Sequence, residues 1–407
     1  MRPIATLIFL TILMASTVYA QDIRVRERLR PMFEFDHVGN FKNGLAVVLK
    51  GNEIAVVDTN GEFIIPFRRN SPFNRLVDFS YGLIPLYDAQ SSLFGFYNTR
   101  GEQVINYHFI DARQFSERLA AVFYGYGWGF VDASGQIIIY PEYTLVSDFN
   151  NGIATVYIEE TGEFGFIDTY GNNIVWLESP RAFRRGLHHA QLPQFSEGLI
   201  AFGITVDSGR IRYGYMDTAG NIVIPPTFYS ASSFSEGRAS VWVEGRAGTA
   251  GIIDKNGNLI MLPRARWIAR FSEGRAVFST GVRDVTEGFI DTYGNEIIAP
   301  VFIYAFNFSE GLAAVRTDDG WGFIDMYGNK IIAPSFEAVT SFSEGFAWVL
   351  QDGKWGILQI YDYERSTVVN VITTMIIPVF VMIIIAYIII LRMVLSYIEL
   401  AQARRRL

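Results

Sequence analysis

The chain has 407 residues and a net charge of −7, is 50% hydrophobic and 15% aromatic, and contains no cysteine. This length can bury a large core, and the lack of cysteine excludes disulfides and cysteine-ligated metal sites. Arg2 contributes +1 and residues 367–407 contribute +3, so that −11 remains for residues 21–366. A region this acidic is a poor partner for nucleic acid or anionic lipid.

Residues 1–20 have the pattern of a cleavable secretory signal. Arg2 precedes an almost wholly apolar stretch, Ile4–Met14, which is too short to span a bilayer. The residues just before Gln21 fit a signal-peptidase site, and an uncleaved anchor is the alternative. Residues 21–35 then form a short N-terminal segment before the repeats.

Residues 36–358 repeat one phrase nine times, and each copy opens with a tetrad whose best form is Phe-Ser-Glu-Gly. Successive tetrads lie 34–39 residues apart, except for one gap of 46. The fourth tetrad position is occupied by Gly44, Gly82, Arg118, Gly152, Gly198, Gly237, Gly274, Gly311 and Gly345. A period of this size predicts an array of stacked supersecondary units.

Each unit is predicted to form a three-stranded antiparallel meander. In the eighth copy, Trp321 and Phe323 alternate with small or aliphatic residues, as in a strand. The following Asp-x-x-Gly fits a type I turn whose glycine, here Gly328, has a positive φ. Two isoleucines form the return strand, and Pro334 is expected to end it. The predicted fold is therefore all-β: about nine short meanders that form either a propeller-like ring or an open β-solenoid.

One unit boundary contains an insertion at residues 180–193, within the gap of 46 residues between Gly152 and Gly198. Insertions in repeat arrays often emerge on the binding face. The basic residues of this insertion are a candidate binding loop, and a solvated loop without a ligand is the alternative. They are Arg181, Arg184, Arg185, His188 and His189.

The C-terminal end has the pattern of a membrane anchor. Residues 359–367 link the array to residues 368–391, which contain no charged side chain and are predicted to form a transmembrane helix. Residues 392–407 form a basic tail, which the positive-inside rule places in the cytoplasm, with the array outside. Together with the signal and the absence of cysteine, this predicts a single-pass protein of a bacterial cell membrane.

The sequence lacks the motifs of zinc hydrolases, serine hydrolases and phosphate-binding loops, and we predict no enzymatic activity, cofactor or metal site. The Ser and Glu of the tetrad are interpreted as residues that bind backbone N–H groups of their own turn. The Asp of Asp-x-x-Gly is interpreted in the same way, because the ligand density of a calcium loop is missing. On this interpretation Glu310→Gln would cost less than about 1 kcal/mol.

A Trp-Gly dipeptide recurs in the middle strand of the unit, with Phe, Tyr or Glu replacing Trp in other copies. With the other recurring positions, over about residues 36–358, the chain resembles the bacterial WG-repeat (KWG-repeat) family. The resemblance implies an exported protein that mediates interactions, and it transfers no catalytic residue. Glycine permits close backbone approach and Trp fills the layer between units, so the dipeptides are predicted to be structural. They are Trp128, Gly129, Trp321, Gly322, Trp355 and Gly356.

These observations predict a membrane-anchored extracytoplasmic repeat protein that binds a protein, a peptide or an envelope glycan. No nucleic-acid partner is expected. The alternative is a structural or sensory component of the cell envelope that assembles or signals through its transmembrane segment and tail.

Overall fold

The computed structural model describes residues 33–71, 76–178, 192–206, 209–243, 250–281 and 285–360. Almost all of them belong to one compact unit of the chain, Glu27–Gln359. The predicted signal peptide, transmembrane helix and basic tail lie outside the described residues. Within the described ranges, no helix has the length and hydropathy needed to cross a bilayer.

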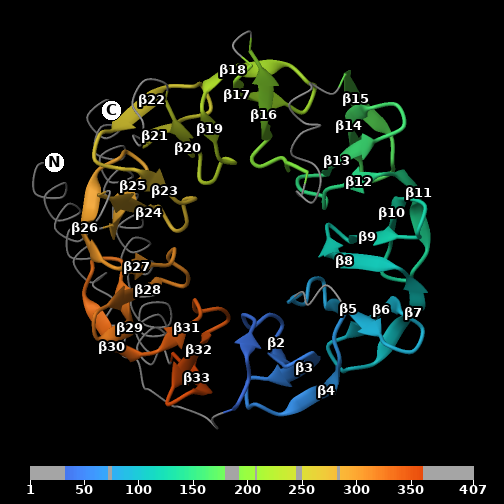
Figure 1. The fold of residues 1–407 in the computed structure, drawn as a ribbon, viewed down its shortest axis with the longest axis horizontal. Helices are drawn as coiled ribbons and strands as arrows, with labels where there is room; N and C mark the ends of the chain where they lie inside the picture. The colour runs from blue at the N-terminus through green and yellow to red at the C-terminus, as the bar shows by residue number, and fades with distance from the viewer. Residues whose placement is uncertain are drawn as a thin grey trace, which may run out of the picture. The chain divides into compact units, whose positions relative to one another are not determined.

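The strands of this unit form nine antiparallel sheets arranged in a ring, a nine-bladed β-propeller (Figure 1). The expectation of nine all-β antiparallel units is confirmed, and the ring replaces the solenoid alternative. We number the blades 1 to 9 in chain order. In each blade the first strand lies nearest the central axis and the last lies at the rim (Figure 1).

The first three blades are made of the following strands. Blade 1 contains β1 (His37–Val38), β2 (Leu45–Lys50), β3 (Glu53–Asp58) and β4 (Phe63–Arg69). Blade 2 contains β5 (Leu83–Asp88), β6 (Leu93–Asn98) and β7 (Gln103–Phe109). Blade 3 contains β8 (Asp111–Ser116), β9 (Leu119–Phe123), β10 (Trp128–Val131) and β11 (Ile137–Tyr143).

The next three blades follow the same order. Blade 4 contains β12 (Leu145–Val146), β13 (Ile153–Ile158), β14 (Glu163–Asp168) and β15 (Asn173–Glu178). Blade 5 contains β16 (Leu199–Thr205), β17 (Ile211–Asp217) and β18 (Ile222–Phe228). Blade 6 contains β19 (Ser230–Ala231), β20 (Ala239–Trp242), β21 (Ala250–Ile253) and β22 (Leu259–Leu262).

The last three blades complete the ring. Blade 7 contains β23 (Trp267–Ile268), β24 (Arg275–Thr280), β25 (Thr286–Asp291) and β26 (Glu296–Phe302). Blade 8 contains β27 (Tyr304–Ala305), β28 (Leu312–Thr317), β29 (Gly320–Asp325) and β30 (Lys330–Phe336). Blade 9 contains β31 (Ala338–Val339), β32 (Phe346–Gln351) and β33 (Lys354–Gln359).

The three-stranded meander predicted from the sequence is incomplete. Six of the nine described sheets have four strands, because residues just before the tetrad add an inner strand. In blade 8 this strand is β27, where Tyr304 pairs with Arg316 and Ala305 with Val315. Most of these strands have two residues, which is too short to produce an alternating sequence pattern.

The proline of the return strand does not end it, which corrects a second prediction. β30 continues through Pro334 to Phe336, and the register with β29 shifts between the Trp321–Phe336 and Phe323–Ile332 pairs. The extra residues of β30 form a bulge opposite Gly322. A bulge allows proline within a strand because it leaves the local ladder unpaired.

The N-terminal end of the described chain closes the ring. Phe33 exchanges two backbone hydrogen bonds with Trp355, at 2.8 and 2.9 Å, and so forms a β-bridge to the outermost strand of blade 9, β33. Phe35 and Trp348 pack in the same buried cluster, with their rings 6.1 Å apart. Blade 9 is therefore completed by residues that the sequence analysis places in a separate N-terminal segment.

The tetrad is a hairpin turn between the first two strands of a blade. In blade 8, Glu310 and Gly311 have φ values of 56° and 80°, and the backbones of Ser309 and Leu312 exchange hydrogen bonds. Two consecutive residues with positive φ are typical of a type I′ hairpin turn. Glycine adopts this conformation readily, which explains why it recurs at the fourth tetrad position.

The Ser and Glu side chains of the tetrad bind the next blade, which corrects the local interpretation. Ser309 Oγ donates to the carbonyl oxygen of Phe342 at 2.8 Å. The carboxylate of Glu310 accepts the backbone N–H groups of Glu344 and Gly345 at 2.6 and 2.8 Å. The same link joins blade 9 to blade 1, because Glu344 accepts the N–H groups of Asn43 and Gly44. The glutamates with such links are Glu117, Glu197, Glu236, Glu273, Glu310 and Glu344.

Glu310→Gln is therefore expected to cost about 1–2 kcal/mol of unfolding free energy, more than a local turn would imply. Glutamine keeps one acceptor oxygen and places an amide against the second N–H donor. Urea denaturation of the variant measures this cost, with Asp319→Asn, on an exposed turn of the same blade, as the control. Equal stability of the two variants would contradict an inter-blade role for Glu310.

Buried aromatic side chains pack the blades together. Phe323 of β29 lies 4.8 Å from the ring of Phe342, the first tetrad residue of blade 9. Phe289 and Phe308 make the same contact between blades 7 and 8, also at 4.8 Å. Each such pair contributes about 0.5–1.5 kcal/mol beyond the burial of its area. The repeated Phe residues thus form the core between blades.

Candidate binding surface

Each blade has two ends that differ in their turns. Leu312 pairs with Asp325, so the tetrad turn and the Asp-x-x-Gly turn lie at one end, which we call the tetrad end. Thr317 pairs with Gly320 and Trp321 with Phe336 at the other end. We call this the connection end, because the outer strand leads from it into the next blade.

At the connection end, directly paired residues form one row across each blade. Paired side chains of neighbouring strands lie on the same face of a sheet. The row of blade 8 is Tyr304, Arg316, Trp321 and Phe336; that of blade 7 is Trp267, Ser279, Glu287 and Phe302; and that of blade 6 is Ser230, Trp242, Ala250 and Leu262.

Where the third strand of a blade contributes a tryptophan to this row, that tryptophan is buried. Trp128, Trp321 and Trp355 of the Trp-Gly dipeptides are 8–9% exposed. In blades 6 and 7, by contrast, the tryptophans of the row lie on strands nearer the axis. Trp242 on β20 is 43% exposed and Trp267 on β23 is 47% exposed. These two side chains are therefore available to a ligand.

Two tyrosines extend this surface, and we refer to Tyr229, Trp242, Trp267 and Tyr304 together as the aromatic surface. Tyr229 is 40% exposed, and its N–H donates to the carbonyl oxygen of Trp242 at 2.8 Å. Tyr304 is 53% exposed. The aromatic surface therefore covers the inner strands of three consecutive blades at the connection end.

Arginines contact both tyrosines. The Arg212 guanidinium lies 4.2 Å from the centre of the Tyr229 ring, and Arg210 donates to the Tyr229 hydroxyl at 3.3 Å. Arg316 lies 5.9 Å from the Tyr304 ring. Cation–π contacts of this kind hold an aromatic ring in one orientation, so the tyrosines are pre-positioned.

In blade 7, Glu287 occupies the position that Trp321 has in blade 8, and it lies in the same row as Trp267. Its Oε2 accepts the N–H of Ala305 in blade 8 at 2.6 Å. Burial raises the pKa of the Glu287 carboxyl, and the Ala305 hydrogen bond opposes this only in part. Among the described residues, no Lys, Arg or His forms an ion pair with Glu287.

The raised pKa gives Glu287→Gln a pH-dependent effect on stability. The folded protein releases the Glu287 proton less readily than the unfolded chain, so the ionised carboxylate costs stability above its ordinary pKa of 4.5. Glutamine keeps an acceptor for the Ala305 N–H without the charge. We expect Glu287→Gln to increase the unfolding free energy by less than about 1 kcal/mol at neutral pH. This gain should disappear when the pH falls below the ordinary pKa of the carboxyl. Thermal melts of both proteins across this range check the prediction, and a variant less stable at neutral pH would contradict it.

The candidate binding loop predicted from the sequence lies within residues 179–191, outside the described residues. Its five basic residues are therefore not placed. The chain before it belongs to β15, where Glu178 pairs with Glu163 at the connection end. After it, Leu192 is buried and the Pro193 carbonyl oxygen accepts a hydrogen bond from Thr155 at 2.8 Å. β15 thus ends at the connection end of blade 4.

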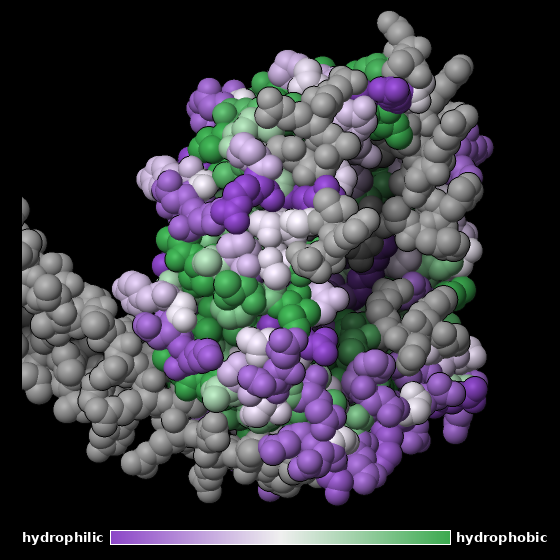
Figure 2. Space-filling view, turned by 60° about the vertical axis from the view of Figure 1, so that its left-hand side comes forward, coloured by the Kyte–Doolittle hydropathy of each residue, from purple (hydrophilic) through white to green (hydrophobic). Residues whose placement is uncertain are grey.

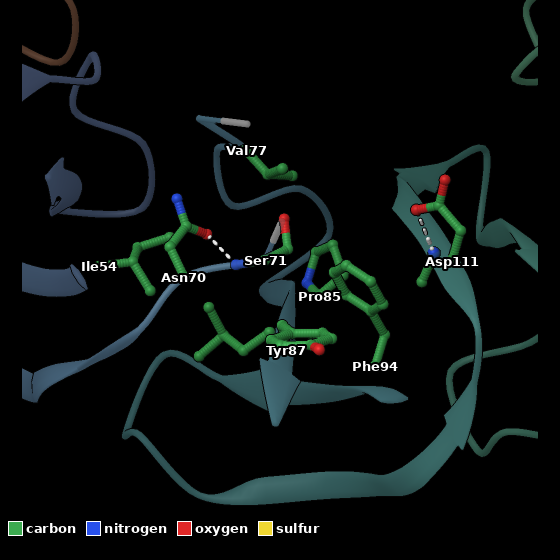
Figure 3. A pocket seen from close by; sticks show the side chains of 10 residues that line it. Ile54, Asn70, Ser71, Val77, Pro85, Tyr87, Phe94 and Asp111 are labelled. Atoms are coloured by element: carbon green, nitrogen blue, oxygen red, sulfur yellow. Dashed lines mark hydrogen bonds between the residues drawn. The ribbon is translucent and has the colours of Figure 1, made fainter. Parts of the chain in front are cut away.

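A small cavity between blades 1, 2 and 3 is too small for a ligand (Figure 3). The space that the centre of a water molecule can occupy in it is about 10 Å³, which is enough for about one water. Tyr87 and Phe94 form one side, and Asn70 accepts the backbone N–H of Ser71 at 2.7 Å within the lining (Figure 3).

The tetrad end carries a different set of exposed groups. Tyr170, Tyr293 and Tyr327 of the Asp-x-x-Gly turns are 71–79% exposed. In blade 8, the turn aspartate Asp325 accepts the N–H groups of Tyr327 and Asn329, both at 2.8 Å. Its carboxylate is thus used within the turn. In the described part of the chain, no three His, Asp or Glu residues are placed to hold a metal ion.

The rim of the propeller exposes apolar side chains of the outer strands. Figure 2 shows one side of the ring, where apolar areas alternate with hydrophilic ones. Phe63, Val104, Ile174, Ile222 and Ile297 follow the Asp-x-x-Gly turns of four blades and the equivalent Asn98–Gly101 turn of blade 2, and they are 39–59% exposed. They are distributed around the whole ring and are not gathered at one site.

The comparisons with known proteins agree with the repeat pattern. The family described as "WG containing repeat" matches residues 33–53, 128–160, 213–245, 288–321 and 321–355. The chain is a WG-repeat protein. No curated protein sequence matches this WG-repeat protein. Each of the four longer matches begins on the strand that holds the Trp-Gly position of one blade and ends in the next blade, and the matches at 33–53 and 321–355 include both partners of the ring closure.

Solved structures resemble the WG-repeat protein in fold alone. A crystal structure of a eukaryotic initiation factor is 14% identical, with a TM-score of 0.50, and the match covers 84% of this chain and 94% of that one. PorZ of Porphyromonas gingivalis, a surface component of the type-IX secretion system, is 12% identical with a TM-score of 0.34, over 82% and 52% of the chains. A virginiamycin B lyase from Staphylococcus aureus is 11% identical with a TM-score of 0.31, over 83% and 100%.

Proposed function

We propose that the WG-repeat propeller is the ligand-binding part of a membrane-anchored extracytoplasmic protein. Its ligand is a protein, a peptide or an envelope glycan, bound at the connection end. The observation that carries this proposal is the exposure of Trp242 and Trp267, at 43% and 47%, on neighbouring blades. Tryptophan and tyrosine are the residues most enriched at the centres of binding interfaces.

The insertion at residues 180–193 supports the choice of the connection end. The strand that precedes it in the chain, β15, ends at that end of blade 4. Its basic cluster would add attraction for acidic groups, on an ectodomain that is otherwise acidic. The membrane anchor and the external location rest on the sequence patterns of residues 1–20 and 368–407.

The test uses the full-length protein, immobilised in detergent and incubated with envelope extract of its own cells. Wild type is compared with the double variant Trp242→Ala/Trp267→Ala and with Tyr293→Ala/Tyr327→Ala. The second variant removes two exposed aromatic rings from the tetrad end and is the matched control. We expect an envelope component that wild type and the tyrosine variant retain and the tryptophan variant loses. Equal retention by all three would contradict binding at the aromatic surface.

A further inference from the structure

We propose that the aromatic surface binds an uncharged, β-1,4-linked oligosaccharide, with Trp242 and Trp267 stacking on the sugar rings and Glu287 accepting sugar hydroxyl groups. This inference rests on the proposed function and names its ligand class. Three observations favour it over other ligands: the geometry of the tryptophans, the presence of a carboxylate in the row of Trp267, and the charge of the domain.

The tryptophans lie on consecutive blades and are joined through the backbone. Trp242 pairs with Ala250, whose N–H donates to the carbonyl oxygen of Ala265 at 2.9 Å, two residues before Trp267. The two rings are thus fixed to neighbouring rigid sheets, which presents them as separate stacking positions. Sugars of the β-1,4-linked gluco type have equatorial substituents and expose axial C–H groups on both faces. Successive residues of such a chain fit a series of aromatic positions.

Glu287 supplies the polar contact that a sugar needs. It lies in the row of Trp267, with one carboxylate oxygen bonded to the Ala305 N–H at 2.6 Å. Hydrogen bonds from hydroxyl groups to a carboxylate are short and strong. Sugar hydroxyl groups would donate to this carboxylate.

Two other ligand classes fit these contacts less well. The centre of a protein interface is depleted of charged residues, whereas here the row of Trp267 contains a carboxylate two strands away from the tryptophan. The net charge of −11 on residues 21–366 disfavours an anionic glycan.

The experiment titrates the full-length protein, in a detergent without a sugar headgroup, while tryptophan fluorescence and heat of binding are recorded. The probes are tetra-N-acetylchitotetraose and cellotetraose as β-1,4-linked sugars, maltotetraose as an α-1,4-linked sugar, and acetylcholine. We expect at least one β-1,4-linked probe to bind and to shift the fluorescence. Trp242→Ala and Trp267→Ala should each weaken this binding about tenfold, and Glu287→Gln should weaken it about threefold.

Tyr293→Ala should leave the affinity unchanged, and circular dichroism melts confirm that each variant is folded. Failure of both β-1,4-linked probes at millimolar concentration overturns the inference, as does equal binding by the Trp267→Ala variant. Binding of acetylcholine alone overturns it in favour of a cation site. If the sugars fail while capture of an envelope component still depends on both tryptophans, the glycan assignment falls and the proposed function stands. If capture is also independent of the tryptophans, both fall.

Discussion

Gly322→Ala is expected to destabilise the propeller by about 3 kcal/mol, one of the largest effects of a single methyl group in this chain. A Cβ atom at Gly322 would lie 2.5 Å from the Ile332 carbonyl oxygen and 2.7 Å from the nitrogen of Pro334. Both are backbone atoms of the bulge in β30, so no side-chain rotation relieves the overlap. The same contact recurs at Gly129, where Cβ would lie 2.5 Å from the Ile139 carbonyl oxygen.

Gly353→Ala is the matched control. Gly353 has a φ of 69° and no atom within 4 Å of a Cβ. Its replacement carries only the conformational strain of alanine at positive φ, about 1–2 kcal/mol. Urea denaturation of both variants separates steric overlap from backbone strain. Equal losses would show that the bulge of β30 moves away from Gly322 at little cost.

Trp348→Ala is expected to cost about 3–5 kcal/mol, because it empties the centre of the seam between blades 9 and 1. Trp348 is fully buried, and its ring stacks on Phe41 with 5.3 Å between centroids. Phe35 contacts it edge to face at 6.1 Å. The loss should appear both as a lower melting temperature and as faster proteolysis of the N-terminal strand.

Trp348→Phe provides the contrast. The indole Nε1 is buried without a hydrogen-bond acceptor, so phenylalanine removes an unsatisfied donor while it keeps most of the ring. We expect this variant to lose less than about 1.5 kcal/mol. A loss as large as that of the alanine variant would show that Nε1 makes a stabilising contact, such as one to a bound water.

The sequence predicts the repeating units well but contains little information about the contacts that join one unit to the next. The period and the Asp-x-x-Gly turn predict nine antiparallel units, because both depend on residues close together in the chain. Closure depends on Phe33, whose surroundings lack the Ile-Ile-x-Pro pattern of the other outer strands. The partner of Glu310 lies 34 residues away in an identical motif, so a turn role and an inter-blade role produce the same pattern.

The aromatic surface could not be predicted for a related reason. Trp242 and Trp267 fall outside the Trp-Gly dipeptide and lie on different strands of their blades. Only the strand register shows that each of them lies in the row of its own blade that corresponds to the row of the buried Trp321 in blade 8. Their one signal in the sequence is that they are tryptophans without an adjacent glycine, which does not distinguish a core position from an exposed one.

The closure of the ring also determines when the chain can finish folding. Glu344 bonds to Asn43 over 301 positions, and Ser343 bonds to Phe41 over 302. During synthesis, blade 1 lacks its neighbour until blade 9 has emerged, and Phe33 lacks its partner Trp355 until then. Contacts this distant in sequence make folding slow. The chain can therefore complete its ring only after its last blade has been made.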